Sequence, residues 1–106
     1  MADKEKFELI ITIVNEGHAD QVMDAAREAG ARGGTISSAR GTGDKNIEKK
    51  YGVVITPQKE MVYIVVNVKE RDQIISAINR AVGIETPGQG VIFSVPVDNI
   101  SGINLN

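Results

Sequence analysis

The hydrophobic pattern of the 106-residue chain changes period several times, and each change predicts a new element. Short stretches rich in β-branched residues predict strands at 7–14, 34–40, 61–68 and 91–97. In 18–30 and 70–83 apolar residues instead recur every three or four positions, which is typical of amphipathic helices that end at a glycine. Residues 41–56 show neither period and are predicted to form a loop or an extended arm.

The order strand, helix, strand, strand, helix, strand indicates an α+β fold of the ferredoxin-like type. In this βαββαβ arrangement a four-stranded antiparallel sheet carries both helices on one face. A chain of this length is expected to form a single domain spanning 1–106. Because the fold carries many unrelated activities, it does not by itself indicate a function.

The face of the sheet that the helices leave uncovered is predicted to be apolar. An antiparallel sheet face in water normally carries polar residues. The strand at 61–68 is apolar on both faces for most of its length. The first strand has Phe7, Leu9, Ile11 and Ile13 on one side and Ile10 and Val14 on the other, and the last strand has Val91, Phe93, Val95 and Val97 opposite Ile92. A contiguous apolar patch on a small domain is typical of an interface. We therefore expect a homo-oligomer whose sheets face inward, and the alternative is a monomer with a hydrophobic surface.

Composition argues against several classes of function. The net charge of −2 and the isoelectric point near 5.3 argue against general nucleic-acid binding. With no cysteine and with His18 as the single histidine, we expect no disulfide, no metal site and no catalytic residues, so the protein is not expected to be an enzyme. The apolar runs are too short to cross a bilayer and the charged N-terminus is unlike a signal peptide, so a cytoplasmic location is expected.

Glycine clusters flank the second predicted strand and precede the last one. The segment 30–43 reads GARGGTISSARGTG, and 88–90 forms a further Gly-x-Gly. Without a Cβ atom, such segments let backbone N–H groups approach a ligand and bind an anion. A single Gly-x-Gly is more often a plain turn. Two such loops that meet along a sheet edge or across a subunit boundary suit a nucleotide or another phosphate-bearing ligand.

Three stretches of the chain resemble PII signalling proteins, and the resemblance extends from about Lys6 to Ile103. They read AGARGGTISSARGTG, YGVVITPQKEMVYIVV and PGQGVIFSVPVDNISGI. The resemblance implies trimers of ferredoxin-like subunits that bind adenine nucleotides in clefts between subunits. It also implies a mobile loop after the second strand, the T-loop, that docks onto enzymes, transporters or regulators. The protein would then be a sensor in nitrogen regulation and not a catalyst.

The resemblance further implies which residues hold the effector. A glycine turn at the T-loop base holds the base and ribose, a second segment reaches the adenine from the neighbouring subunit, two apolar residues line the cleft, and a glycine loop wraps the phosphates. The turn at the T-loop base is Gly41, Thr42 and Gly43, and the segment that reaches the adenine is Gly33, Gly34 and Thr35. The apolar cleft residues are Ile13 and Ile64, and the phosphate loop is Gly88, Gln89 and Gly90. Arg40 is a cation beside the first of these groups.

Several positions depart from the PII pattern and change the expected effector. The chain has Val91 where the family's phosphate loop ends in a lysine, and Gly102 and Asn104 where arginines neutralise phosphates. Lys45 replaces a glutamine used with magnesium and 2-oxoglutarate. Gln58 replaces a lysine that helps hold this keto acid, although the next residue is a lysine. Because burying a triphosphate without cations is costly, AMP or ADP is expected in place of ATP with magnesium and 2-oxoglutarate.

The charged loop is expected to be an arm that contacts a partner, which the resemblance implies is a membrane transporter or a metabolic enzyme. Its candidate docking residues are Lys45, Lys49, Lys50 and Tyr51. A solvated charged loop is the plainer alternative. Tyr51 lies where some PII proteins carry a modifiable tyrosine, but packing of its ring at the start of a strand is favoured.

Two other functions stay open, namely a trimeric interaction module without nucleotide binding and an amino-acid-binding regulatory domain.

Overall fold

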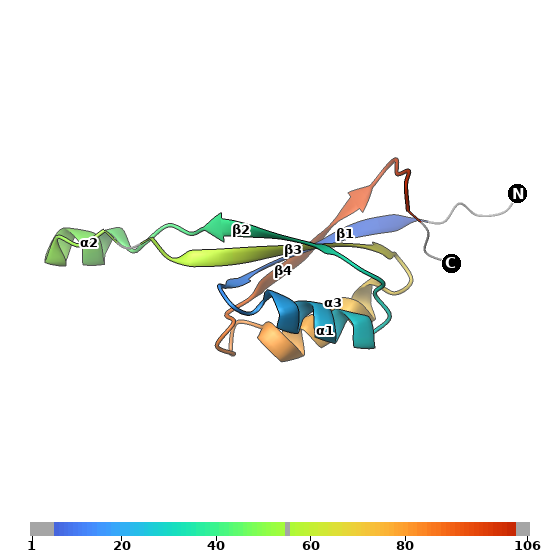
Figure 1. Ribbon diagram of the computed structural model, residues 1–106, viewed down its shortest axis with the longest axis horizontal. Helices are drawn as coiled ribbons and strands as arrows, with labels where there is room; N and C mark the ends of the chain where they lie inside the picture. Colours follow the sequence, from blue (N-terminus) through green and yellow to red (C-terminus); the bar gives the residue numbers. More distant parts are fainter. Residues whose placement is uncertain (1–5, 55, 104–106) are drawn as a thin grey trace, which may run out of the picture.

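The computed structural model describes residues 6–54 and 56–103, which form one four-stranded sheet with two long helices on the same face (Figure 1). In chain order the elements are β1 (Phe7–Asn15), α1 (Ala19–Glu28), β2 (Thr35–Arg40), α2 (Lys45–Tyr51), β3 (Gln58–Asn67), α3 (Arg71–Val82) and β4 (Val91–Val97). Neighbouring strands are antiparallel in the order β2-β3-β1-β4. The predicted ferredoxin-like fold is therefore confirmed.

The core lies between the sheet and the helices α1 and α3. Ile74, Ile78 and Val82 of α3 are fully buried, as the apolar stripe of this helix predicts. The strands contribute alternate residues to the same layer, namely Ile10, Thr12, Val14, Val62, Ile64 and Val66. Burying one such aliphatic side chain stabilises a fold by about 1.5–3 kcal/mol relative to leaving it exposed. This layer is thus the main source of stability.

Helix α1 ends at a glycine in the left-handed region, as predicted. Gly30 has a φ of +114°, and its N–H donates to Arg27 O at 3.1 Å. The N–H of Ala31 donates to Ala26 O at 2.9 Å. These two bonds form the Schellman motif, which satisfies carbonyl groups that the last turn would leave unpaired. Gly83 ends α3 for a different reason, because a Cβ atom there would lie 2.5 Å from a carbonyl oxygen of the last turn.

The two long helices run antiparallel, and a glutamine side chain of each donates a hydrogen bond to a backbone carbonyl at the end of the other. Gln21, the third residue of α1, donates from Nε2 to Ala81 O near the end of α3 at 3.2 Å. Gln73, the third residue of α3, donates from Nε2 to Ala29 O just after α1 at 2.8 Å. The two β-α-β halves therefore contact each other with an approximate two-fold symmetry.

The start of α1 is capped by a strand that is distant in sequence. His18, the residue before the helix, makes no side-chain cap. Glu60 Oε1 on β3 accepts instead from Gly17 N at 2.7 Å and from Ala19 N at 3.1 Å. A carboxylate in this place also interacts favourably with the positive end of the helix dipole. The contact ties α1 to the sheet.

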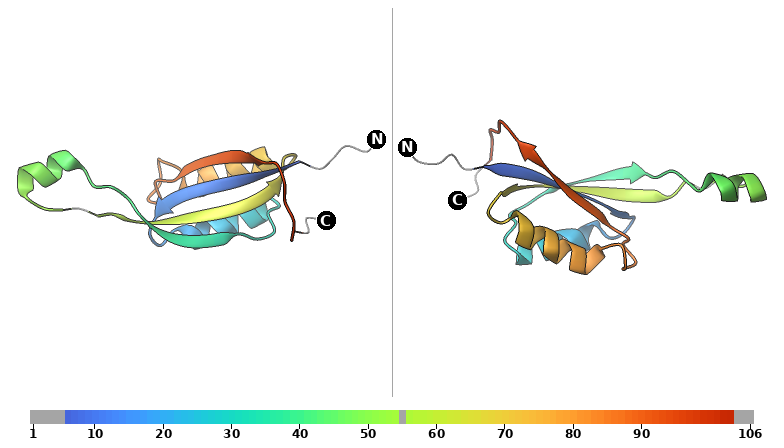
Figure 2. Two further views of the ribbon diagram at one scale, coloured as in Figure 1. Left: turned by 90° about the horizontal axis from the view of Figure 1, so that it is seen from above. Right: turned by 180° about the vertical axis from the view of Figure 1, so that it is seen from behind.

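Between β2 and β3 the chain forms an arm that projects from one end of the sheet (Figure 2). The prediction of a loop over 41–56 is wrong for the tip of the arm, which forms α2. Asp44 Oδ1 accepts from Asn46 N at 2.8 Å and from Ile47 N at 3.3 Å, and Gly52 ends the helix with a φ of +66°. No residue of α2 is buried, so the helix has no apolar stripe that periodicity could detect.

Candidate functional site

The open face of the sheet has the apolar character that the sequence predicts. Leu9 on β1 pairs with Val65 on β3 and with Val95 on β4. On the edge strand β4, Val91, Phe93 and Val95 expose 53%, 41% and 39% of their surface. Such a face is more stable against another apolar surface than in water.

The first glycine segment lines a hollow beside the start of β2. The hollow has a volume of about 300 Å³ and is lined by Arg32, Gly33, Gly34, Thr35, Tyr63, Val65 and Ile103. A Cβ atom on Gly34 would lie 2.8 Å from Tyr63 O and 2.9 Å from Met23 Sδ, so packing inside the chain requires this glycine. Gly33 differs, because no atom lies within 4 Å of its Cβ position. It leaves room for a ligand.

The two apolar residues that were expected at the cleft lie on opposite faces of the sheet. Ile13 lies half-buried on the open face, between Met61 and Val91. Ile64 is fully buried toward the helices, so the prediction that it lines the cleft is wrong. Because successive side chains of a strand point to opposite faces, the next residue, Val65, lines the hollow instead.

The second glycine segment lies at the other end of β2, at the base of the arm. A hollow of about 370 Å³ there is lined by Arg40, Gly41, Thr42, Gly43, Lys45, Glu48, Val54 and Thr56. Gly41 N–H donates to Pro57 O at 2.8 Å and closes the base of the arm. The two ends of β2, Thr35 and Arg40, line different hollows and lie about 17 Å apart along the strand, so one chain does not bring the hollows together.

The loop at 88–90 is less available to a ligand than expected. The N–H of Gln89 already donates to Thr86 O at 3.0 Å, and that of Gly90 to Val82 O at 2.6 Å. Both Gly88 and Gly90 are buried, and a Cβ atom on Gly90 would lie 2.5 Å from Val82 O. Two of the three amides expected to hold phosphates are thus used inside the chain, and packing against α3 explains both glycines.

Lys59 connects the arm base to this loop, although the sequence analysis did not include it among the site residues. Its Nζ donates to Asn15 Oδ1 at 2.6 Å. Asn15 donates from Nδ2 to Pro87 O at 2.9 Å and from its backbone N to Gly88 O at 2.9 Å. On the other side, Lys59 Cε would lie 3.3 Å from a Cβ atom on Gly41. A continuous set of contacts therefore crosses this end of the sheet.

Comparison with known proteins places the chain in a family. The family described as Nitrogen regulatory protein P-II matches residues 7–105. The chain belongs to the PII family. PII proteins are regulators, and the chain is therefore a regulatory protein. Comparison with curated protein sequences gave no match.

Solved PII structures share the fold of this PII chain. Arabidopsis thaliana PII bound to citrate superposes with a TM-score of 0.68 at 26% identity, covering 94% of this chain and 82% of that one. The B. subtilis GlnK–ATP complex gives a TM-score of 0.66 at 17% identity, covering 88% and 84%. A further structure of B. subtilis GlnK gives 0.65 at 17% identity, covering 87% and 85%.

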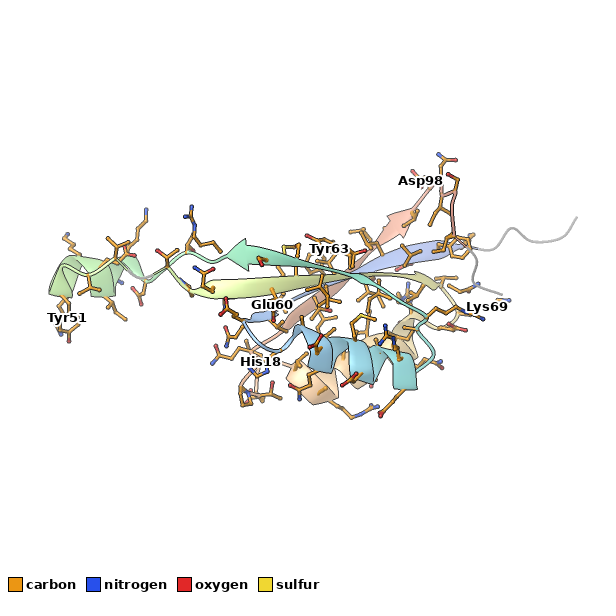
Figure 3. All side chains as sticks on the ribbon, in the orientation of Figure 1. His18, Tyr51, Glu60, Tyr63, Lys69 and Asp98 are labelled. Atoms are coloured by element: carbon orange, nitrogen blue, oxygen red, sulfur yellow. The ribbon has the colours of Figure 1, made fainter. Side chains whose placement is uncertain are left out.

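The candidate docking residues of this PII chain all lie on the arm helix α2. Figure 3 shows the side chain of Tyr51 on this helix. Lys45, Lys49 and Lys50 are exposed, and Tyr51 exposes 65% of its surface at the end of the helix. The expectation that Tyr51 opens a strand and packs its ring is therefore wrong. Lys50 Nζ lies 5.4 Å from the ring centroid. Ile47, one turn earlier, is also exposed, so the tip offers an apolar pair among lysines.

The described residues also bear on metal binding and on membrane spanning. Within residues 6–54 and 56–103, no group of histidine and acidic residues could hold a metal ion. In the same part of the chain no helix is long and apolar enough to span a membrane. Gly102 lies in an exposed turn with a φ of +80°, and Asn104 lies outside the described residues.

Proposed function

We propose that this PII-family regulator binds an adenine nucleotide in a cleft between subunits of a homotrimer, and that binding controls a transporter or an enzyme through the 43–56 arm. The observation that carries the proposal is the separation of the two glycine hollows by strand β2. Only a second copy of the chain can bring the 33–35 segment of one subunit to the 41–43 segment of another.

The sizes of the hollows support a shared site. At about 300 and 370 Å³ each lies at the lower end of the range for small-molecule pockets. Joined across an interface, the two would enclose the base on one side and the ribose and phosphate on the other. The apolar open face provides the surface through which copies of the chain associate.

A nucleotide with few phosphates suits the charges at this site. Arg40 and Lys45 line the arm-base hollow, but Glu48 lines it as well. Each additional phosphate brings negative charge that must be balanced when it leaves water. AMP or ADP therefore fits better than ATP with magnesium and 2-oxoglutarate. The PII structures with citrate and with ATP support a small anionic effector in general.

Control through the arm requires an effector that favours one of its conformations. A ligand shifts an equilibrium only when it binds the two states with different affinity. The arm base is part of the site, because residues 41–43 line the hollow and Gly41 is bonded to Pro57. Occupation of the site changes the contacts of the base, while the exposed α2 contacts the partner.

Light scattering after size-exclusion chromatography tests the assembly, and a thermal-shift series tests the effector. We expect a trimer and a rise in melting temperature of several degrees with AMP or ADP in large excess. The other arms of the series are ATP with magnesium and 2-oxoglutarate, and free amino acids. A monomer in solution contradicts the proposal, and so does the absence of a shift with every adenine nucleotide.

Gly33→Val is the sharpest variant for the site. No atom of its own chain lies within 4 Å of the new Cβ, and the φ of Gly33 lies outside the left-handed region, so the fold should be kept. We expect the trimer to persist and stabilisation by AMP or ADP to be lost. Ser76→Val, an exposed site on α3, is the matched control and should respond like wild type. Gly90→Val is unsuitable, because it would collide with the end of α3.

An interaction module that has lost nucleotide binding is the second candidate. The internal hydrogen bonds of the Gln89 and Gly90 N–H groups favour it. This function predicts a trimer that contacts a partner through α2 and that no adenine nucleotide stabilises. The same thermal-shift series separates the two functions, and a shift with amino acids alone indicates an amino-acid-binding regulatory domain.

A further inference from the structure

Lys59 is the least compensated charge beside the proposed site. It is half-buried, and its ammonium donates to a neutral acceptor, Asn15 Oδ1, at 2.6 Å. The ion pairs that the described part of the chain contains belong to Arg71 and not to Lys59. Taking an ammonium partly out of water without a counter-charge is costly, so this group favours an anion from outside.

The surroundings of Lys59 leave space for such an anion. In the sheet the lysine lies between Asn15 of β1 and Ala39 of β2, which are both uncharged. Gly41 has no side chain to cover the lysine stem, and a Cβ atom there would lie 3.3 Å from Lys59 Cε. The cations Arg40 and Lys45 line the adjoining hollow. Lys59 itself does not line that hollow, but its stem passes beside Gly41, which does.

Asn15 holds Lys59 through an amide that is fixed in orientation. Nδ2 of Asn15 donates to Pro87 O at 2.9 Å, which directs Oδ1 toward the lysine. The backbone N–H of Asn15 donates to Gly88 O at 2.9 Å, so the residue is anchored to the 86–90 loop twice. A phosphate oxygen is a stronger acceptor for an ammonium than a neutral amide oxygen. The bond between Lys59 and Asn15 is therefore one that a phosphate can replace.

We propose that Asn15 Oδ1 is an internal acceptor that occupies Lys59 Nζ while the site is empty, and that a phosphate oxygen of the effector displaces it. The proposal rests on the proposed function in taking a nucleotide as the effector. When the acceptor is exchanged, the stem of Lys59 shifts against Gly41, whose N–H closes the arm base on Pro57. The same exchange thus passes effector binding to the arm.

A charge series at position 15 tests the exchange. Asn15→Asp gives Lys59 an internal counter-charge that competes with phosphate, so the affinity for ADP in isothermal titration calorimetry should fall about tenfold or more. Lys59→Met keeps the stem, removes the charge and should cause a comparable loss. Asn15→Ala removes the competing acceptor, so its affinity should stay at or above that of wild type. In the Lys59→Met background, Asn15→Ala should bring no gain.

Asn67→Asp is the matched control for added charge. It lies at the other end of β3, where the side-chain oxygen already accepts from Lys69 N at 2.9 Å and an aspartate can do the same. Its affinity for ADP should equal that of wild type. A fall with Asn15→Ala as large as that with Asn15→Asp would show that Asn15 contacts the effector directly, and would overturn the proposal.

Inorganic pyrophosphate, which carries phosphate oxygens without adenine, separates this inference from the proposed function. If wild type binds pyrophosphate but not ADP, and Asn15→Asp weakens that binding, the exchange stands and the adenine nucleotide is wrong. If ADP binds wild type and Asn15→Asp equally, the exchange is wrong and the proposed function stands. If wild type binds neither probe, both are overturned. Thermal melts of each variant confirm that it is folded.

Discussion

The body helices and the arm helix of this protein are held by different interactions. Helices α1 and α3 bury apolar stripes, and their ends are satisfied by Gln21, Gln73 and Glu60 across the fold. Helix α2 buries nothing, and its ends are satisfied by its own neighbours, Asp44 and Gly52. A helix of this length without tertiary packing is marginal in water. We therefore expect the arm to change conformation more readily than the body.

This division suits a regulatory protein. The candidate site lies where the two regions meet, because Gly41 lines the hollow and its N–H closes the arm base on Pro57. An effector bound there touches the locally ordered arm and the rigid sheet at once. The comparison between body and arm can be tested by paired substitutions that change equivalent features in each.

Truncation of a buried isoleucine should give the largest difference. Ile78→Ala in α3 removes part of a fully buried side chain and should lower the free energy of unfolding by about 2–5 kcal/mol. Ile47→Ala in α2, where the side chain is 41% exposed, should change it by less than about 0.5 kcal/mol. Chemical denaturation at one fixed protein concentration measures both. Equal losses would show that α2 belongs to the cooperative body.

Removal of the helix caps should give a smaller difference. Glu60→Ala leaves the N–H groups of Gly17 and Ala19 without their acceptor and should cost about 1–2 kcal/mol of global stability. Asp44→Ala should leave global stability within about 0.5 kcal/mol of wild type, because it acts on an element outside the core. Hydrogen exchange should instead become faster at 45–51. A global loss in Asp44→Ala that matches Glu60→Ala would contradict the comparison.

Replacement of the terminal glycines should give a difference of about the same size as removal of the caps. Gly30→Ala places a Cβ atom at ordinary distance from Gln73 Nε2, 3.5 Å, so its cost of about 1–2 kcal/mol comes from the positive φ. Gly52→Ala carries a similar local strain at a φ of +66°. Its effect should be confined to fraying of α2, seen as faster exchange in the arm without a change in melting temperature. A drop in melting temperature for Gly52→Ala would count against a separable arm.

Several features of the fold were predictable because they depend on a few neighbouring residues. The isoleucine stripe of α3 and the glycine that ends α1 follow from helical spacing and from backbone preference at Gly30. The apolar open face follows from the alternation along β1 and β4. The caps of α2, Asp44 and Gly52, are also visible in the sequence, but seven residues without a buried stripe gave no periodic signal.

The site was harder to predict, and β3 shows why. Residues 61–66 are apolar on both faces, so no alternation of polar and apolar residues marks which side of the strand is exposed. The sequence therefore does not show whether Ile64 or Val65 faces the open side. The same uncertainty hid Lys59, which strand pairing places opposite Asn15. At 88–90 the glycines are present, but the N–H of Gln89 donates to Thr86 O within the loop and the N–H of Gly90 donates to Val82 O at the end of α3.

By itself the sequence determined the order of the elements and the positions of glycine and apolar residues, because backbone preference and side-chain period act over a few residues. Only the tertiary structure decided that Ile64 enters the core and that Lys59 meets Asn15. These facts depend on the register between strands that are distant in the sequence. That register is fixed when one face of the sheet is buried against two helices.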